Sequence, residues 1–516
     1  MTEISSRRRW ATLAILCAAS LLLSIDLTVL HLAIPKLVAD LNPTGNQILW
    51  IADIYGFTLG GLLVLMGNLG DRIGRKRLLL IGSVAFGLAS VVTAYAPTPE
   101  LLIAARALLG VAGATIMPST LSIIRNVFTD ARERTSAVGV WGGVTAGGFA
   151  LGPIVGGTLL EFFWWGSVFL INVPVVIAIV IAGTLVIPES RNPRPGRLDV
   201  LSALLSIVGI VSVIYAIKEG FHGGFGQTGV LTAVALGALA LTVFGVRQTR
   251  LADPLIDLRL FRNRAFSASI AATTVSMFAN LALSLILSQY LQLVLGWSPV
   301  KAGLAGLPGG MAGMAGGFLA GTLVHRIGRA AVVSGGLGLS AVGFALYTLI
   351  GRDTGYATLL PAMLVFGLGI GVSFATVSDT VLASVPRERA GAASAISETA
   401  TEIGGAVGMG VLGSVLNRTY REHLELPPGL PAEAEAPVRE SLGTALHVAA
   451  QLPGDLAGAL AQAARWAFID GLHVMVISCA VLVGVLAVAA LVALRGVPAV
   501  LDTEEAMAQS ATGPMR

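Results

Sequence analysis

Charged residues are the scarcest broad class in this sequence. Lys, Arg, Asp and Glu make up only 12% of the 516 residues, whereas 55% of the residues are hydrophobic. A soluble globular protein carries about 25% charged residues. The shortage therefore excludes a soluble globular protein and indicates a chain that crosses a membrane many times. The net charge of +4 is modest, and no nucleic acid partner is expected from it.

Cysteines and catalytic motifs are also few. Cys17 and Cys479 are the two cysteines of the chain, and both lie in apolar segments, so small buried residues are favoured over a disulfide or a metal site. The sequence has no G-x-x-x-x-G-K-[ST] phosphate loop, which argues against ATP as the energy source. Only the loop at 418–466 is long enough for a soluble domain, and it has no metal or nucleophile pattern. We therefore expect neither an enzyme nor a cofactor.

Long apolar segments fill most of the chain. A helix needs about 20 apolar residues to cross a bilayer, and about fourteen segments meet this length. They lie at 11–38, 47–68, 77–96, 101–125, 136–160, 167–188, 198–217, 228–247, 265–292, 302–324, 330–350, 357–383, 391–416 and 468–494. The sequence predicts an all-α integral membrane protein with fourteen transmembrane helices.

Basic residues cluster in every second connection between these spans. The clusters are Arg7–Arg9, Arg72–Arg77, Arg132–Arg134, Arg191–Arg197, Arg247–Arg264, Arg326–Arg329 and Arg387–Arg389. Loops rich in Lys and Arg stay on the cytoplasmic side. The pattern predicts that both termini are cytoplasmic in a multi-pass protein of the cell (inner) membrane.

The spans divide into three groups. Residues 1–190 and 264–516 each supply six helices, and residues 191–263 supply two more between them. A weak repeat supports this division, since Gly67–Arg77 (GNLGDRIGRKR) and Gly321–Arg329 (GTLVHRIGR) each follow the second span of a half. Such repetition suits a transporter with its substrate site between two halves. The loop at 418–467 is interpreted as a helical hairpin formed by 438–451 and 456–466, with a flexible linker as the alternative.

Asp26 lies in the middle of the first apolar span, in LLLSIDLTVLHLAIP. A charged group at the centre of a membrane helix costs about 2.5 kcal/mol or more, so such a residue is read as functional by default. Low dielectric favours the neutral acid, which lets the group exchange a proton near neutral pH. We predict that Asp26 couples proton movement to transport and contacts the substrate.

Two further charges fall at a similar depth. Asp53 lies in the second span and Arg106 in the fourth. Two acids in a low-dielectric site can share one proton, and a deep arginine needs a counter-charge. We assign Asp53 and Arg106 to proton coupling, and Asp53 also to substrate binding. The alternative for Asp26 is a purely structural pair with Arg106.

Three acids in the second half are candidates for recognising cations. Glu398 and Glu402 are four residues apart and share a helix face, and Asp379 lies in the preceding span. The alternative for all three is a hydrated cytoplasmic mouth. Residues with aromatic or sulfur-containing side chains are expected to line the cavity by cation–π and soft contacts, with ordinary packing as the alternative. These are Tyr55, Trp141, Phe278 and Met311.

The loop after the second span resembles the signature loop of the major facilitator superfamily. Three more segments extend the likeness: LLIAARALLGVAGATIMP at 101–118, the fifth-span string ending in G-P-x-x-G-G, and FLINVP at 169–174. Asp26 with its neighbours and Asp53 resemble the fourteen-helix drug:proton antiporter branch, in particular its quaternary-ammonium and methyl-viologen exporters. The resemblance implies gating roles for Gly67, Asp71, Arg72, Gly74, Arg75, Gly152, Pro153, Gly156 and Gly157. In the second copy of the loop His325 replaces the acid, which puts a gate there in doubt.

The resemblance implies a major facilitator fold of two six-helix bundles with two extra helices between them. It also implies efflux of lipophilic or cationic compounds, such as quaternary ammonium biocides and dyes, in exchange for protons. The expected partners are these small molecules, protons and the lipid bilayer, with the protein as a monomer. Three rivals remain: a dedicated exporter of one antibiotic or metabolite, a proton-coupled importer, and a membrane-bound enzyme or receptor. The ending Gly152–Gly157 argues against the importer.

Overall fold

The computed structural model describes residues 5–43, 45–191, 199–251, 254–351, 355–386 and 390–498, and every regular element in these ranges is a helix. The first half contains α1 Ser6–Leu41, α2 Gly45–Ile73, α3 Arg75–Ala94, α4 Pro99–Val127, α5 Ala131–Phe162, α6 Ser167–Leu170 and α7 Asn172–Val186. The middle contains α8 Val200–Gly223, α9 Thr228–Arg250 and η1 Leu258–Arg262. The second half contains α10 Arg264–Gln289, η2 Tyr290–Val294, α11 Pro299–Ile327, α12 Arg329–Leu346, η3 Tyr347–Leu349, α13 Tyr356–Ala383, α14 Ala390–His423, α15 Ala432–Glu440, α16 Leu442–Ala449 and α17 Gly454–Ala493.

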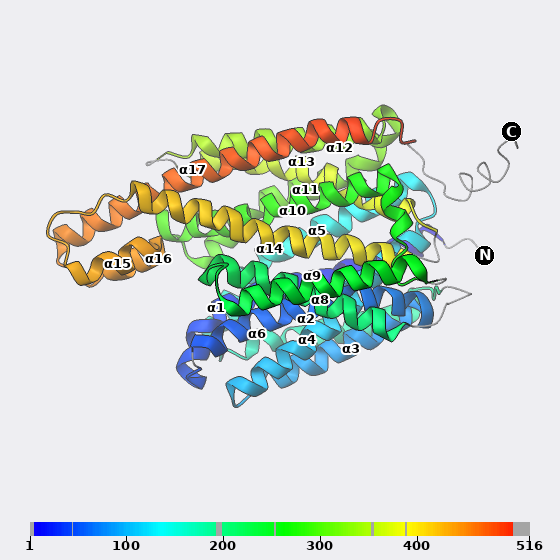
Figure 1. Ribbon diagram of the computed structural model, residues 1–516, viewed down its shortest axis with the longest axis horizontal. Helices are drawn as coiled ribbons and strands as arrows, with labels where there is room; N and C mark the ends of the chain where they lie inside the picture. Colours follow the sequence, from blue (N-terminus) through cyan, green and yellow to red (C-terminus); the bar gives the residue numbers. More distant parts are fainter. Residues whose placement is uncertain are drawn as a thin grey trace, which may run out of the picture.

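The long helices lie side by side along the longest axis of the molecule (Figure 1). α1 begins and α17 ends at the same end of the bundle, which we call the terminal end, and α15 and α16 project from the opposite end. Within the described ranges, thirteen helical segments are long and apolar enough to cross a membrane. α5, with 32 residues, is not among the thirteen but packs between α1 and α11. The all-α, multi-pass prediction is confirmed.

The two copies of the repeated loop have the same backbone design. Gly74 separates α2 from α3 with φ of +113°, and Gly328 separates α11 from α12 with φ of +81°. Side chains with a Cβ rarely adopt this conformation, whereas glycine does so readily. Each glycine therefore lets the chain reverse between two long antiparallel helices.

Buried apolar side chains form separate clusters in the two halves. One cluster draws mainly on α1–α7, and another on α10–α14, α16 and α17. A smaller cluster joins α8 to α2 and to the terminal-end parts of α13 and α14. Cys17 and Cys479 are both buried and free, as expected for small core residues.

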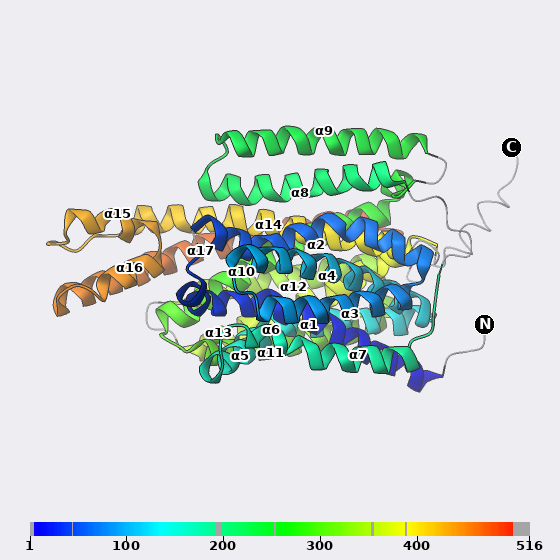
Figure 2. The same ribbon diagram turned by 90° about the horizontal axis from the view of Figure 1, so that it is seen from below.

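The pair α8 and α9 lies at the edge of the bundle, with α9 outermost (Figure 2). α8 packs against α2 and α14, whereas α9 packs mainly against α8. At the terminal end Arg247 Nε donates to Asp199 Oδ2 over 2.9 Å. Hydrogen bonds from Arg247 lower the pKa of Asp199 to about 2, so this pair stays ionised at neutral pH.

The segment 418–467 differs in part from the sequence interpretation. α14 extends to His423, and α17 already begins at Gly454, so the stretch 456–466 is the start of the last long helix rather than one arm of a hairpin. The two short helices are α15 and α16, and the hydroxyl of Tyr420 donates to the Val438 carbonyl over 2.9 Å. Arg387–Arg389 and most of the cluster at 191–197 lie outside the described residues.

Candidate functional site

Asp26 is completely buried near the middle of α1. The Nδ2 of Asn172, at the start of α7, donates to Asp26 Oδ1 over 2.9 Å. On the other side, Nη1 of Arg106 lies 3.8 Å from Asp26 Oδ2. That oxygen and that nitrogen are both buried without a hydrogen-bond partner. Asp26 therefore has one oxygen held by a neutral amide and one oxygen facing a positive charge.

Arg106 is held mainly by groups other than Asp26. Its Nε donates to the backbone carbonyl of Ile51 on α2 over 2.8 Å. Its guanidinium lies 5.2 Å from the ring centre of Tyr55 and 5.9 Å from that of Phe169, which is within cation–π range. A tight structural salt bridge with Asp26 is thus not what fixes the arginine, and the charge can influence Asp26 without bonding to it.

The predicted coupling residues gather around this arginine. Electrostatic interactions link Arg106 to Asp26, Tyr55 and Asp53. Tyr55 is fully buried, whereas Asp53 is half-buried. Tyr55 also interacts electrostatically with Glu402 on α14, which brings one second-half acid to the face of the first half. The structure thus joins Asp26, Asp53, Tyr55, Arg106 and Glu402 in one charged region.

Glu398 and Glu402 interact with each other along α14. Glu398 is buried and Glu402 is half-buried. In the described part of the chain Glu398 forms no ion pair, so it differs from the buried acids that arginines neutralise. These two glutamates keep the features expected of groups that recognise a cation.

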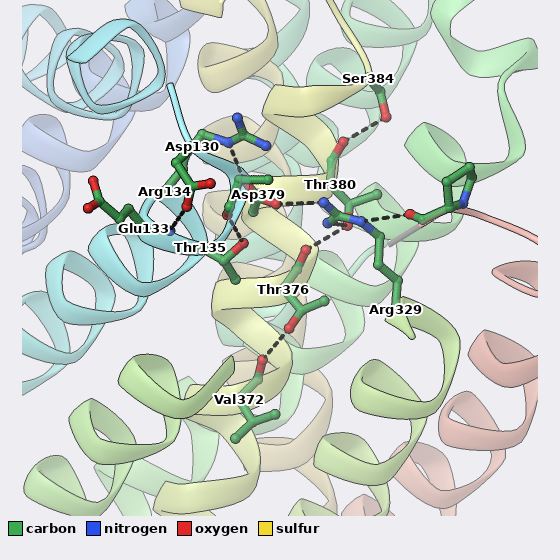
Figure 3. Close-up of polar contacts among 12 residues, drawn as sticks. Asp130, Glu133, Arg134, Thr135, Arg329, Val372, Thr376, Asp379, Thr380 and Ser384 are labelled. Atoms are coloured by element: carbon green, nitrogen blue, oxygen red, sulfur yellow. Dashed lines mark hydrogen bonds and ion pairs between the residues drawn. The ribbon is translucent and has the colours of Figure 1, made fainter. Parts of the chain in front are cut away.

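Asp379 lies in a different place, at the terminal end. Arg134 of α5 contacts its Oδ1, and Nη2 of Arg329 donates to its Oδ2 over 2.9 Å (Figure 3). Nη1 of Arg329 also donates to the Thr380 hydroxyl over 2.8 Å. Because arginines engage both carboxylate oxygens, this arrangement opposes the substrate-binding prediction for Asp379. We call Arg134, Arg329 and Asp379 the α5–α13 cluster.

The signature loop forms a second cluster between the halves. Asp71 Oδ1 accepts from Nη2 of Arg75 over 2.7 Å. The same carboxylate accepts from the backbone N–H groups of Gly391, over 3.0 Å, and Ala392, over 3.2 Å. These N–H groups lie in the first turn of α14 and have no acceptor within the helix. A negative charge is stabilising at this position. We call Asp71, Arg75, Gly391 and Ala392 the α2–α14 cluster.

Three other members of the signature loop have local roles. A Cβ on Gly67 would overlap the Gly391 carbonyl, so Gly67 allows α2 and α14 to meet. Arg72 donates from Nε to Asn68 Oδ1, within α2, over 2.9 Å. Gly74 provides the reversal described above. Gly67 and Asp71 thus contact α14 of the second half, whereas Arg72 bonds within α2.

The fifth-span glycines lie against the helix that carries Asp26. Cβ atoms on Gly148, Gly152 and Gly156 would overlap Ser24, Thr28 and Val29 of α1, respectively. Gly157 instead faces Val300 of α11, at 3.2 Å from an added Cβ. The backbone of Pro153 belongs to α5, but its side chain lies outside the described residues. The small residues therefore let α5 pack closely on α1, the helix that carries Asp26.

The other face of α5 meets α11 across the two halves. Gly139 lies against Gly317, and Gly143 against Met314. Trp141 is only 2% exposed within the first-half core, and Phe278 packs against the second-half core. Met311 is 70% exposed, so it is not part of the packed core, and its cavity-lining role stays a prediction.

Sequence reasoning did not assign roles to Asn172, Ser90, Arg134, Arg329 or Gly391. The stretch FLINVP at 169–174 contains Asn172 and was the one signal for it. The repeated loop contains Arg329, and in this copy His325 stands where the first copy has an acid. In the structure Arg329 pairs with an acid from another helix, Asp379 of α13.

Comparison with known proteins agrees with this architecture. The family model described as Major Facilitator Superfamily matches residues 16–409. The chain is 43% identical to the multidrug efflux pump LfrA of Mycolicibacterium smegmatis, covering 95% of this chain and 97% of that protein. It is 37% identical to the methyl viologen resistance protein SmvA of Salmonella typhimurium, covering 90% and 93%.

A solved structure shares the fold. The crystal structure of the human organic anion transporter MFSD10 (TETRAN) matches with a TM-score of 0.57 and 16% sequence identity. The match covers 92% of this chain and all of that one. At this identity the likeness supports the fold alone.

Proposed function

The chain belongs to the major facilitator superfamily, and from this premise we propose that it is a proton-coupled antiporter that exports lipophilic and cationic compounds. The relatives are a multidrug efflux pump and a methyl viologen resistance protein, and methyl viologen is an organic dication. These names support a transporter of small molecules rather than an enzyme.

One observation carries the proposal for the coupling mechanism. Asp26 is fully buried, and its Oδ2 faces Arg106 at 3.8 Å without a hydrogen bond. An oxygen with no fixed partner in a low-dielectric site can gain or lose a proton without breaking a hydrogen bond. A nearby positive charge stabilises an ionised carboxylate. Asp26 thus has the environment of a proton carrier.

In the proposed cycle the proton and the cation compete for one negative charge. A proton that enters from outside neutralises Asp26. Asp53, which also interacts with Arg106, can share this proton. The neutral acid no longer attracts the bound cation, which leaves outward. After the halves rock, the proton departs to the cytoplasm and Asp26 is again available to a cation. No step needs a nucleotide, metal or other cofactor.

Glu398 and Glu402 are proposed to recognise the cation from the second half. Glu402 lies within electrostatic range of Tyr55, so a cation near Tyr55 would interact with acids from both halves. Trp141 and Phe278 remain proposals for apolar contact.

The two clusters at the terminal end are proposed to form the cytoplasmic gate. Each cluster joins the halves: Asp71 reaches the start of α14, and Arg134 reaches Asp379. Both clusters must open before a drug can enter from the cytoplasm. Gly152 and Gly156 are proposed to keep the opposite side sealed by holding α5 on α1, and Gly157 by holding α5 on α11. The gating role proposed for Pro153 rests on the resemblance alone.

The same proposal sets the arrangement in the cell. The chain is a multi-pass membrane protein, and we place it as a monomer in the cytoplasmic membrane with both termini in the cytoplasm. The bundles at 1–190 and 264–516 are the bodies that rock, and 191–263 forms the additional helix pair. The loop at 418–467 then faces outside.

Inside-out vesicles with an acidic interior test the proposal. Ethidium or a viologen dye should accumulate in vesicles that contain the wild-type chain, and collapse of the pH gradient should stop the accumulation. Asp26→Asn should abolish gradient-driven uptake because the amide cannot exchange a proton. Asp199→Asn is the matched control, since Asp199 pairs with Arg247 at the edge of the bundle and should leave uptake near the wild-type level.

Two results would redirect the proposal. Unchanged uptake by Asp26→Asn would remove this residue from coupling and shift the role to Asp53 or Glu402. No uptake of any lipophilic cation by a folded protein would favour a dedicated exporter of one antibiotic or metabolite.

A further inference from the structure

Asn172 occupies a break between two helical segments. It is the first residue of α7 and follows Ile171, which separates α7 from α6. Pro174 lies in the first turn of α7, where a missing N–H is tolerated. The Asn172 side chain is fully buried, and α7 packs against both α1 and α3. The helix break therefore sets an amide at the meeting point of three elements.

The hydrogen bonds around Asn172 fix the direction of its amide. Nδ2 donates to Asp26 Oδ1 over 2.9 Å and to the Ser90 hydroxyl oxygen over 3.0 Å. Ser90 donates its own hydroxyl hydrogen to the Phe86 carbonyl over 2.8 Å, so towards Asn172 it can only accept. A flipped amide would place its oxygen against two acceptors. Both N–H groups of Asn172 are thereby committed.

This orientation leaves a buried acceptor without a partner. The Oδ1 of Asn172 has no hydrogen bond, and such a group costs stability. A residue chosen for packing alone would avoid that penalty.

The two oxygens of Asp26 differ as a result. Oδ1 is held by Asn172, whereas Oδ2 has no hydrogen-bond partner and faces Arg106 of α4. The other titratable groups in this region are Tyr55 and Asp53 of α2, with Glu402 of α14 beyond Tyr55. Within the described residues Asn172 is the sole side chain that donates a hydrogen bond to Asp26.

We infer that Asn172 is a positioning residue that holds Oδ1 of Asp26 and leaves Oδ2 as the oxygen that takes up and releases the coupling proton. An amide donor does not titrate, so it supports the ionised carboxylate at every working pH. This inference rests on the proposed function, in which Asp26 carries the proton.

The test measures binding of tetraphenylphosphonium to the purified full-length chain as a function of pH. Binding by the wild type should weaken as pH falls, because protonated Asp26 does not attract the cation. Asn172→Leu keeps a similar side-chain volume and removes the donor. The pH of half-maximal binding should rise by about one unit, the size expected for loss of a hydrogen bond to a charged group. At alkaline pH its affinity should return to the wild-type value.

The matched control is Asn126→Leu. Asn126 is a partly buried asparagine on α4 that donates to the Ser122 carbonyl of its own helix over 2.8 Å. Its loss should leave the pH midpoint unchanged. Should Asn172→Leu fail to fold, Ser90→Ala removes the acceptor that orients the amide, and a smaller rise in the midpoint is expected.

Three results would overturn the inference. If the pH midpoint of Asn172→Leu equals that of the wild type, the amide has no influence on the proton. Where only Ser90→Ala folds, an unchanged midpoint in that variant has the same meaning. Weakening by the same factor at every pH would show a purely structural role. Binding by the wild type that does not depend on pH would overturn the proposed coupling by Asp26, and this inference with it.

Discussion

Arg106 lies close to Asp26 but is not bonded to it. The nearest nitrogen and oxygen are 3.8 Å apart, while Arg106 Nε donates to the Ile51 carbonyl over 2.8 Å. An arginine anchored by its neighbours acts as a fixed positive charge. Its Nη1 faces Oδ2 of Asp26, which has no hydrogen-bond partner. This relationship is the one that the proposed coupling role of Asp26 requires.

Loss of this charge should stop coupling. Arg106→Ala should lower gradient-driven ethidium uptake at least about tenfold, because removing one partner of a buried charge pair costs several kcal/mol. Arg106→Lys keeps the charge but loses the bond to Ile51, so an intermediate rate is expected. Uptake by everted vesicles, normalised to folded protein, measures both. A wild-type rate in Arg106→Ala would contradict the role given to this arginine.

The α2–α14 cluster should hold the terminal end closed. Asp71→Asn weakens the ion pair with Arg75 and the hydrogen bonds to Gly391 and Ala392, and should favour the conformation open at that end. A cysteine at Ser394, which is buried beside this contact, should react at least about tenfold faster with a maleimide in the Asp71→Asn background, since a hydrogen bond to a charged group is worth more than 1.4 kcal/mol.

Asp199→Asn serves as the control for this labelling experiment. Its ion pair with Arg247 also lies at the terminal end but ties α8 to α9 rather than one half to the other. Labelling of the Ser394→Cys variant should not change. Equal acceleration in both backgrounds would mean that the cluster does not close the gate.

The α5–α13 cluster should show strong coupling between its members. Asp379→Asn leaves Arg134 and Arg329 without their shared counter-charge and should lower the thermal midpoint of the purified protein. Breaking a buried ion pair on one side typically costs about 3–5 kcal/mol. Adding Arg134→Gln should recover part of the loss, because one uncompensated charge is removed. Strict additivity of the two changes would argue that the residues do not interact.

The close packing of α5 against α1 should depend on individual glycines. Gly152→Ala puts a Cβ into the Thr28 hydroxyl and should reduce transport severely by displacing the helix that carries Asp26. Gly147→Ala is the matched control, because a Cβ there meets nothing within 4 Å, and close to wild-type transport is expected. Thr28→Ala should partly restore the Gly152→Ala variant. Equal loss in both alanine variants would mean that close packing is not what the glycines provide.

The sequence was sufficient for features that depend on hydrophobicity along the chain. Apolar length predicted the membrane helices, and a carboxylate inside such a run singled out Asp26. The repeated loop indicated two related halves, and Gly74 and Gly328 stand at the helix reversals of its two copies.

Features that depend on which way a helix faces were harder to predict. Lipid is as apolar as the bundle interior, so the sequence of α11 could not reveal that Met311 is exposed. Asp379 resembled Glu398 in its surroundings along the chain, and only the fold brings Arg134 and Arg329 to it. Asn172 carries no charge and sits at a helix break, so neither periodicity nor charge marked it.

The most direct test of the central claim is the release of protons when a cation binds. In weakly buffered detergent solution near the pH of half-maximal binding, tetraphenylphosphonium should release protons from the wild-type protein. Asp26→Asn should still fold and should release none, because the group that exchanges the proton is gone. Proton release by Asp26→Asn equal to that of the wild type would contradict the account and place the coupling proton elsewhere.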